Sequence, residues 1–271
     1  MVNESQRSSN AKERIVHLDL KGAPPKLAYF EEFFKIAQKA GATGVLIEWE
    51  DMFPFSGKLS IARNRQSYSV SDVQQIIRWA TKYQLQVIPL AQTAGHMGWI
   101  LKQPDFADLR EVKDDKHIIC LTDPKGLDIV KDVIDQMMKL HSPYTRYFHI
   151  GADEVRKIGQ CRRCVSTMNQ KKLLPSELLL NRIQVLAEYI YEKHGKKTLI
   201  WHDMLDNVSD NLFDKYKLDQ HVQPVVWIYG PSIDYYLTER FWNRFSQHFP
   251  TVWGASAFKG ANGIKEIMER F

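Results

Sequence analysis

Seven short apolar runs alternate with amphipathic, helix-like stretches along this chain, and this alternation limits its fold more than any other feature. We expect the runs to be strands, at residues 15–20, 44–49, 86–90, 147–150, 198–202, 225–228 and 251–255. Apolar strands separated by helices are typical of a parallel sheet with both faces buried. The repeat predicts an α/β fold of the TIM (β/α)8 barrel type that lacks the last strand and helix.

A doubly wound open sheet is the alternative fold, because it uses the same alternation of strands and helices. That fold should offer a Gly-x-Gly-x-x-Gly phosphate turn after its first strand. Here the first strand is followed by Lys-Gly-Ala-Pro-Pro at residues 21–25, which does not match. We therefore expect a barrel domain at residues 15–271, preceded by a polar N-terminal extension at residues 1–14.

The chain carries 37 basic and 32 acidic side chains, and the resulting charge of +5 is scattered without a long run. This distribution indicates a solvated surface, and we expect no nucleic-acid partner. No apolar stretch approaches the roughly 18 residues of a membrane span, and residues 1–14 lack the apolar core of a secretion signal. We expect a protein of the cytoplasm or nucleus that does not bind membranes.

Three cysteines, an odd number, favour reduced thiols over a disulfide framework. Cys161 and Cys164 have the spacing of half a structural zinc site, but no second pair of this kind follows. We interpret them as free thiols in a loop. The sequence therefore predicts no metal ligands, and no feature of it calls for a cofactor.

The stretch Tyr147–Val155 is the main candidate for a functional site. Its apolar strand leads to Gly151, and two adjacent carboxylates, Asp153 and Glu154, follow. In a barrel, residues just past the C-terminal end of a strand face the ligand. The alternative is that these acids only favour the N-terminus of a following helix, but residues 156–169 look like a loop. Asp153 and Glu154 are the predicted catalytic residues.

Other polar and aromatic side chains are expected at the same face, because each follows or ends a predicted strand. They are Asp19, Lys21, Glu50, Asp51, His96, Trp201, Asp203, Trp227 and Tyr229. Carboxylates beside aromatic rings suit sugar chemistry, because an acid protonates the glycosidic oxygen and flat rings pack on the pyranose. The histidines of this face could instead indicate a metal-dependent amidohydrolase, but a His-x-His after the first strand is absent.

Adjacent carboxylates do not suit the ordinary glycosidase scheme, in which two carboxyl groups flank the scissile bond about 5 Å or more apart. Side chains alternate along a strand, so Asp153 and Glu154 can enter one site only if the strand has ended between them. This geometry suits an acid and a helper that positions a group on the substrate.

The segment His149–Glu154, with the sequence HIGADE, resembles the H-x-G-[GA]-D-E signature of family 20 glycoside hydrolases, the β-N-acetylhexosaminidases. Residues 89–96 resemble the third strand of that family and its loop histidine, here His96. Trp201 and Trp227 resemble the tryptophans that wall its acetamido pocket. The chain as a whole is most similar to the intracellular branch of the family.

The resemblance implies an exo-acting enzyme that hydrolyses terminal non-reducing N-acetylgalactosamine or N-acetylglucosamine residues of glycosides or glycoconjugates. It implies a substrate-assisted retaining mechanism, in which the 2-acetamido oxygen forms an oxazolinium intermediate. Glu154 would be the general acid and base, and Asp153 would orient the acetamido group. His149 and the remaining candidates would bind substrate. The preferred epimer, the natural aglycone and a homodimer stay open.

Three departures from the family pattern support a second interpretation. Lys21 stands where the family commonly has an arginine after the first strand, and residues 254–258 show no Tyr-x-Asp. The chain ends at Phe271 before an eighth strand and the tryptophan that usually closes the site. A fragment or shortened isoform of this kind would be a catalytically silent, sugar-binding barrel.

Overall fold

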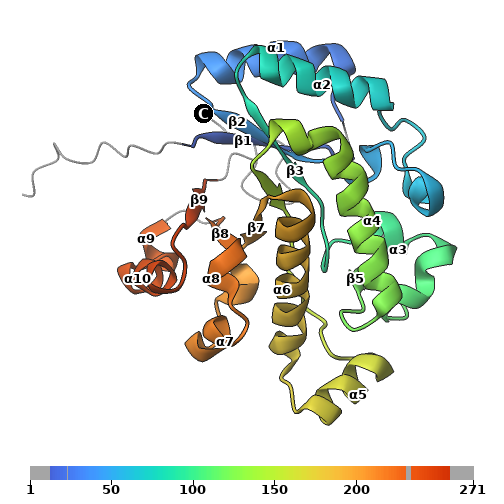
Figure 1. Ribbon diagram of the computed structural model, residues 1–271, viewed down its shortest axis with the longest axis vertical. Coiled ribbons are helices and arrows are strands. Elements are labelled where there is room, and N and C mark those ends of the chain that lie inside the picture. Colours follow the sequence, from blue (N-terminus) through green and yellow to red (C-terminus); the bar gives the residue numbers. More distant parts are fainter. Residues whose placement is uncertain (1–12, 23, 230–232, 257–271) are drawn as a thin grey trace, which may run out of the picture.

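A computed structural model of the protein describes residues 13–256 apart from residues 23 and 230–232 (Figure 1). Seven parallel strands form one sheet, in sequential order. They are β1 (Ile15–Asp19), β2 (Gly44–Glu48), β3 (Gln86–Leu90), β6 (Tyr147–His149), β7 (Lys197–Trp201), β8 (Val222–Trp227) and β9 (Trp253–Ala255). The sheet is the predicted barrel type. Within the described residues, no eighth strand joins the free edges of β1 and β9.

Helices cover the outer face of the curved sheet (Figure 1). They are α1 (Leu27–Lys39), α2 (Val70–Lys82), α4 (Pro124–His141), α6 (Pro175–His194), α7 (Asp210–Lys215), α8 (Leu218–His221), α9 (Ile233–Tyr236) and α10 (Glu239–His248). No helix among the described residues combines the length and the apolar character needed to cross a bilayer.

Local sequence explains where the long helices begin and end. Asp123 caps α4 by accepting hydrogen bonds from the backbone N–H groups of Lys125 and Gly126, and proline follows it at the first helical position. Ser69 and Asp72 form a reciprocal capping box at the start of α2. Gly195 ends α6 in the left-handed conformation that glycine adopts without a steric penalty.

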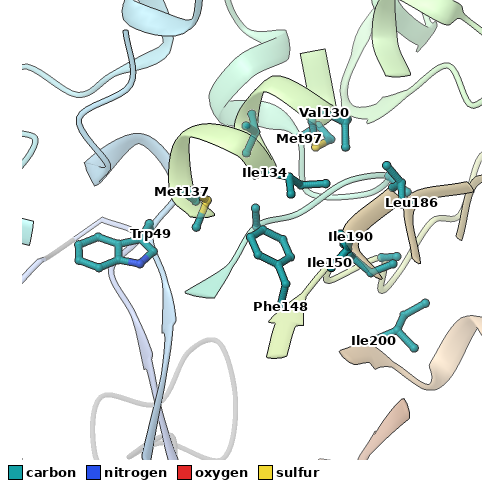
Figure 2. Close-up of a cluster of buried hydrophobic side chains, with 14 of the residues drawn as sticks. Trp49, Met97, Val130, Ile134, Met137, Phe148, Ile150, Leu186, Ile190 and Ile200 are labelled. Atoms are coloured by element: carbon teal, nitrogen blue, oxygen red, sulfur yellow. The ribbon is translucent and has the colours of Figure 1, made fainter. Parts of the chain in front are cut away.

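The main core lies between the helices and the outer face of the sheet, and it supports the strand that leads to the predicted catalytic pair. Phe148, Ile150 and Ile200 point outward from β6 and β7 (Figure 2). They pack with apolar side chains of α4 and α6, among them Ile134 and Ile190. A smaller cluster inside the curved sheet contains residues of β2, β3, β7 and β8.

The connections after β3 and β6 differ from the prediction. The first contains a short helix, α3 (Gly98–Leu101), and an antiparallel hairpin of β4 (Arg110–Val112) and β5 (Asp115–Ile119). The second was predicted to be a loop at residues 156–169, but it forms helix α5 (Arg162–Lys171). Cys161 caps this helix, because its sulfur accepts a hydrogen bond from the backbone N–H of Cys164. A cysteine is a rare cap, so the helix start could not be recognised from the usual residues.

Candidate active site

A cavity of about 740 Å³ lies inside the curved sheet. Nine of the predicted site residues line it: Asp19, Lys21, His96, His149, Asp153, Glu154, Trp201, Trp227 and Tyr229. Glu50 and Asp203 stand directly behind this wall, where they contact Lys21 and the backbone of Glu154. Asp51 lies elsewhere and pairs with Lys102 at 3.4 Å.

Strand periodicity explains why these side chains converge. In β2, Val45 and Ile47 belong to the outer core, whereas Leu46 belongs to the inner cluster. Side chains alternate along a strand, so Glu48 points inward from the last position of β2. The same alternation directs the last inward position of each neighbouring strand into the cavity, including Asp19 and Trp201.

Gln92 and His96, in the connection after β3, hold the carboxylate of Asp153. The side-chain amide of Gln92 donates to Oδ1 of Asp153 over 2.9 Å and to Glu48 over 3.3 Å, while its carbonyl accepts from the backbone N–H of Ala152 over 3.1 Å. The Nε2 atom of His96 lies 3.3 Å from Oδ2 of Asp153. Both oxygens of Asp153 are therefore fixed from the adjoining strand connection.

The backbone of residues 151–154, which carry the candidate catalytic pair, is bent into an unusual conformation. Gly151, Ala152 and Glu154 all have positive φ angles, of 64°, 65° and 49°. A Cβ atom on Gly151 would lie 2.1 Å from Oε1 of Gln92, so only glycine fits there. Left-handed non-glycine residues are strained, and such residues cluster at functional sites. This bend lets consecutive side chains at 153 and 154 reach the same cavity.

Glu154 is less enclosed than Asp153, since 39% of its side chain is exposed, compared with 18% for Asp153. Its backbone N–H donates to Oδ2 of Asp203 over 2.8 Å, which holds the main chain. Its side chain contacts the guanidinium of the exposed Arg156 at 2.8 Å and lies 3.5 Å from Nε2 of His96. The carboxyl group can therefore meet a leaving group and then water.

The electrostatics of the pair favour an ionised Asp153. Burial opposes ionisation of Asp153, but hydrogen bonds from His96 and Gln92 outweigh it and lower the pKa of Asp153. The hydrogen bond to Asp153 in turn raises the pKa of His96, despite burial. Burial raises the pKa of Asp203 behind the loop. Asp153 is thus held as a carboxylate at the cavity.

Lys21 stands at the centre of a group of acids at the ends of β1 and β2. Its Nζ atom lies 3.0 Å from Glu50, 3.6 Å from Asp19 and 4.0 Å from Glu48. Burial raises the pKa of Glu50 to about 7. The group thus combines a cation with carboxylates beside the cavity.

Aromatic side chains wall the cavity, among them Trp201, Trp227 and Trp253. Trp201 packs against His149 with ring centres 4.4 Å apart, and Trp227 lies 5.2 Å from Tyr229. His149 is fully buried, and burial lowers its pKa to about 3, so it is neutral. Its Nδ1 atom accepts from the backbone N–H of Gly151 over 3.0 Å. His149 therefore ties the loop to the aromatic wall.

Sequence reasoning missed Gln92, Glu48 and Gly95 as parts of the site. Glu48 was counted only as a strand residue, although a single acid in an apolar strand is a signal of an inward polar position. Gly95 permits close approach, because a Cβ atom there would lie 2.5 Å from the backbone oxygen of Asp153. The contacts of Gln92 with Asp153 and Ala152 join residues 61 and 60 positions apart. Contacts over such distances leave no recognisable pattern in the local sequence.

The ion pair between His96 and Asp153 predicts a pH-dependent stability. The lowered pKa of Asp153 stabilises the fold above about pH 4, and this contribution is lost as pH falls. The raised pKa of His96 stabilises it fully below about pH 6.5, and this contribution is lost as pH rises through the raised value. The destabilisation caused by His96→Gln should therefore be largest between about pH 4 and 6.5 and shrink toward pH 9.

Urea unfolding of both proteins at several pH values measures this difference. His117→Gln, at an exposed histidine of β5, is the matched control. A destabilisation by His96→Gln that does not vary with pH would contradict the ion pair.

Comparisons with known proteins identify the family of this chain. Residues 41–232 match the family described as glycosyl hydrolase family 20, catalytic domain. The chain is 38% identical over 257 residues to hexosaminidase D of Bos taurus, covering 94% of this chain and 74% of the bovine protein. It is also 38% identical to hexosaminidase D of Homo sapiens, and there it spans 53% of the human protein.

Solved structures show the same fold at lower identity. A β-N-acetylhexosaminidase from Bacteroides fragilis superposes with a TM-score of 0.70 at 22% identity, over 92% of this chain and 50% of that one. A family 20 exo-β-N-acetylglucosaminidase from Vibrio harveyi, solved with N-acetylglucosamine, superposes with a TM-score of 0.67 at 18% identity, over 90% of this chain and 41% of that one. On the family match and the identity to hexosaminidase D, the chain belongs to glycosyl hydrolase family 20.

Proposed function

We propose that this protein is an exo-β-N-acetylhexosaminidase that releases terminal non-reducing N-acetylgalactosamine or N-acetylglucosamine by a substrate-assisted, retaining mechanism. The observation that carries the proposal is the different setting of two adjacent carboxyl groups at one cavity. Asp153 is enclosed, doubly held and ionised, whereas Glu154 is half-exposed. Two neighbouring acids with different environments suit two different roles.

Asp153 would act on the acetamido group of the substrate. The substrate carbonyl oxygen attacks the anomeric carbon, the bond to the leaving oxygen breaks, and positive charge develops on the acetamido nitrogen. A fixed carboxylate that accepts the acetamido N–H stabilises that charge without reorganising during the reaction. Gln92 and His96 hold Asp153 for this task.

Glu154 would move the proton. In the first step its carboxylic acid donates a proton to the departing glycosidic oxygen, and the oxazolinium ion forms. In the second step the resulting carboxylate accepts a proton from water as the water oxygen attacks the anomeric carbon. The bond from that carbon to the acetamido oxygen breaks, and the acetamido group is restored. Two inversions give overall retention, and Glu154 regains its proton.

The rest of the cavity would bind and orient the sugar. Trp201 and Trp227 offer flat apolar surfaces for the acetamido methyl group and the pyranose face. Lys21 and Asp19 offer a donor and an acceptor for hydroxyl groups. We place this chemistry in the cytoplasm or nucleus, because all three cysteines are unpaired, as reducing compartments keep them.

Aryl N-acetylhexosaminides of both epimers whose N-acetyl group carries zero to three fluorines test the proposal. Fluorine withdraws electron density from the acetamido oxygen, so kcat/KM should fall with each fluorine if this oxygen is the nucleophile. A stable thiazoline mimic of the cyclic intermediate should bind at least about 10²-fold tighter than substrate.

Each alternative gives a different result in that experiment. An enzyme nucleophile would give a shallow fluorine dependence and a covalent glycosyl adduct on an Asp or Glu. Absence of turnover with retained binding of N-acetylglucosamine would instead favour the silent, sugar-binding barrel.

A further inference from the structure

All three cysteines of the chain meet at one point with a glutamate, although they come from separate parts of the sequence. The sulfur atoms of Cys120, Cys161 and Cys164 and a carboxylate oxygen of Glu111 all lie within 4.8 Å of one another. The sulfur of Cys120 is 3.4 Å from that of Cys161 and 3.6 Å from that of Cys164. Four potential metal ligands therefore face a common centre.

Three elements bring these ligands together. Glu111 lies in the middle of β4, Cys120 directly follows β5, and Cys161 and Cys164 form the first turn of α5. The two cysteines of that turn are three positions apart, so they lie on one face of the helix. The hairpin and the helix start thus provide two ligands each.

Glu111 is arranged as a ligand that is itself held in place. Its Oε1 atom accepts hydrogen bonds from the backbone N–H groups of Gln160, over 2.6 Å, and Cys161, over 3.0 Å. Its Oε2 atom points to the sulfur of Cys164 at 3.2 Å. Metal ligands in proteins are oriented by hydrogen bonds of this kind.

Three of the four candidate ligands are buried and Cys161 is half-buried, and no cation of the described residues contacts the carboxylate of Glu111. Glu111 and Cys120 are each 3% exposed, and Cys164 is fully buried. Glu111 contacts two backbone N–H groups and one thiol, and no basic side chain of the described residues pairs with it. The buried Arg182 donates to the backbone oxygens of Cys120 and Leu121 instead. A buried carboxylate is costly unless it is hydrogen-bonded or coordinates a metal, and the Oε2 atom of Glu111 is placed to coordinate one.

We propose that Glu111, Cys120, Cys161 and Cys164 bind one zinc ion in a structural, tetrahedral site. Zinc–sulfur bonds of about 2.3 Å place tetrahedral sulfur ligands about 3.8 Å apart, close to the separations of 3.4 and 3.6 Å seen here. A disulfide would need about 2.05 Å and would leave the third thiol and the carboxylate unused. Zinc replaces the three thiol protons, which pass to solvent, and four protein ligands leave no open position.

The charge of the bound state also fits the surroundings. Zinc with three thiolates and one carboxylate carries a net charge of −2. The guanidinium of Arg182 lies beside the cluster, with Nη2 3.3 Å from the backbone oxygen of Cys120. This buried cation offsets part of the excess negative charge.

The site would fasten the far end of the loop that carries the candidate catalytic pair. Asp153 and Glu154 lie between β6 and Cys161, so zinc would fix the chain seven residues beyond Glu154 to the hairpin. The ion pair between Lys157 and Asp115, at 2.7 Å, joins the same loop and hairpin. Zinc binding itself does not depend on the proposed glycosidase activity, so the two can be tested apart.

Metal analysis of the full chain tests the site. The protein is purified under reducing conditions without chelator, incubated with zinc, freed of excess ion and analysed by mass spectrometry of the metal. We expect about one zinc per chain. Cobalt in place of zinc should give the sulfur-to-metal charge-transfer bands and strong visible bands of a tetrahedral thiolate complex.

Variants identify the ligands. Cys120→Ser and Cys164→Ser should lose stoichiometric zinc, and Glu111→Gln should bind it more weakly. Asp114→Asn removes an exposed carboxylate from the same hairpin and should bind zinc like the unmodified chain.

Three results would overturn the proposal. They are no uptake of zinc or cobalt by the reduced chain, a disulfide between two of the cysteines in freshly purified protein, or full zinc binding by Cys164→Ser. The cobalt spectrum of the unmodified chain decides the question even if a cysteine variant does not fold.

The cysteine pair alone had suggested free loop thiols, because its sequence spacing supplied only two ligands. The fold adds Glu111 and Cys120, which lie 50 and 41 positions before Cys161.

Discussion

Replacing Glu154 with glutamine should lower kcat for an aryl N-acetylhexosaminide by about 10²–10⁴-fold while the protein stays folded. The amide has the shape of the acid but cannot donate its proton to the leaving oxygen or accept one from water. The side chain is 39% exposed and contacts Arg156 and His96 instead of the core. Its loss should therefore leave the melting temperature nearly unchanged.

Leaving-group dependence makes this prediction sharper. An aglycone of low pKa departs without help from an acid, so the formation step should recover for a dinitrophenyl substrate, while the water step remains slow. A burst of released phenol followed by slow turnover is the expected signature. Glu192→Gln, at an exposed position of α6, is the matched control and should keep full activity. Unreduced kcat in Glu154→Gln would remove Glu154 from the mechanism.

Asp153→Asn should lower kcat/KM by about 10²–10³-fold, because a neutral amide cannot balance the charge that develops on the acetamido nitrogen. The affinity for the product N-acetylglucosamine should fall less than kcat/KM, since the product carries no such charge. The penalty for each fluorine in the acetamido series should also become steeper or turnover should vanish.

A second measurement distinguishes loss of the Asp153 charge from a collapse of the loop at residues 151–154. The pKa of His96 is raised chiefly by its hydrogen bond to Asp153, so it should fall in Asp153→Asn, as followed by NMR of the imidazole. The exposed Asp108→Asn is the control for both measurements. If Asp153→Asn retained full turnover with an unchanged fluorine dependence, Asp153 would have no part in stabilising the intermediate.

The order of strands and the position of the candidate catalytic pair could be predicted from the sequence, because both depend on short-range patterns. Apolar runs such as that of β2 mark buried strands, and Asp153 and Glu154 directly follow one of them. The face that carries the site then follows from the rule that parallel strands end at a common edge.

The supporting contacts could not be predicted, because they join distant positions. Gln92 meets Asp153 across 61 positions, and Cys120 meets Cys164 across 44. Polar side chains at such positions look like ordinary loop residues until the fold brings them together. Helix α5 was missed for a related reason, since its cap is a cysteine and its interior is mostly polar.

The left-handed backbone at Ala152 should limit which substitutions this position tolerates in a mutational scan. Ala152 is buried and chemically inert, yet a φ of 65° excludes β-branched side chains almost as firmly as chemistry excludes changes at Asp153. A map of tolerated substitutions would therefore mark residues 151–154 as one uniform block. Within that block, Ala152→Gly would distinguish a constraint on backbone conformation from a constraint on chemical reactivity. Glycine adopts this φ without strain, and the substitution removes no functional group.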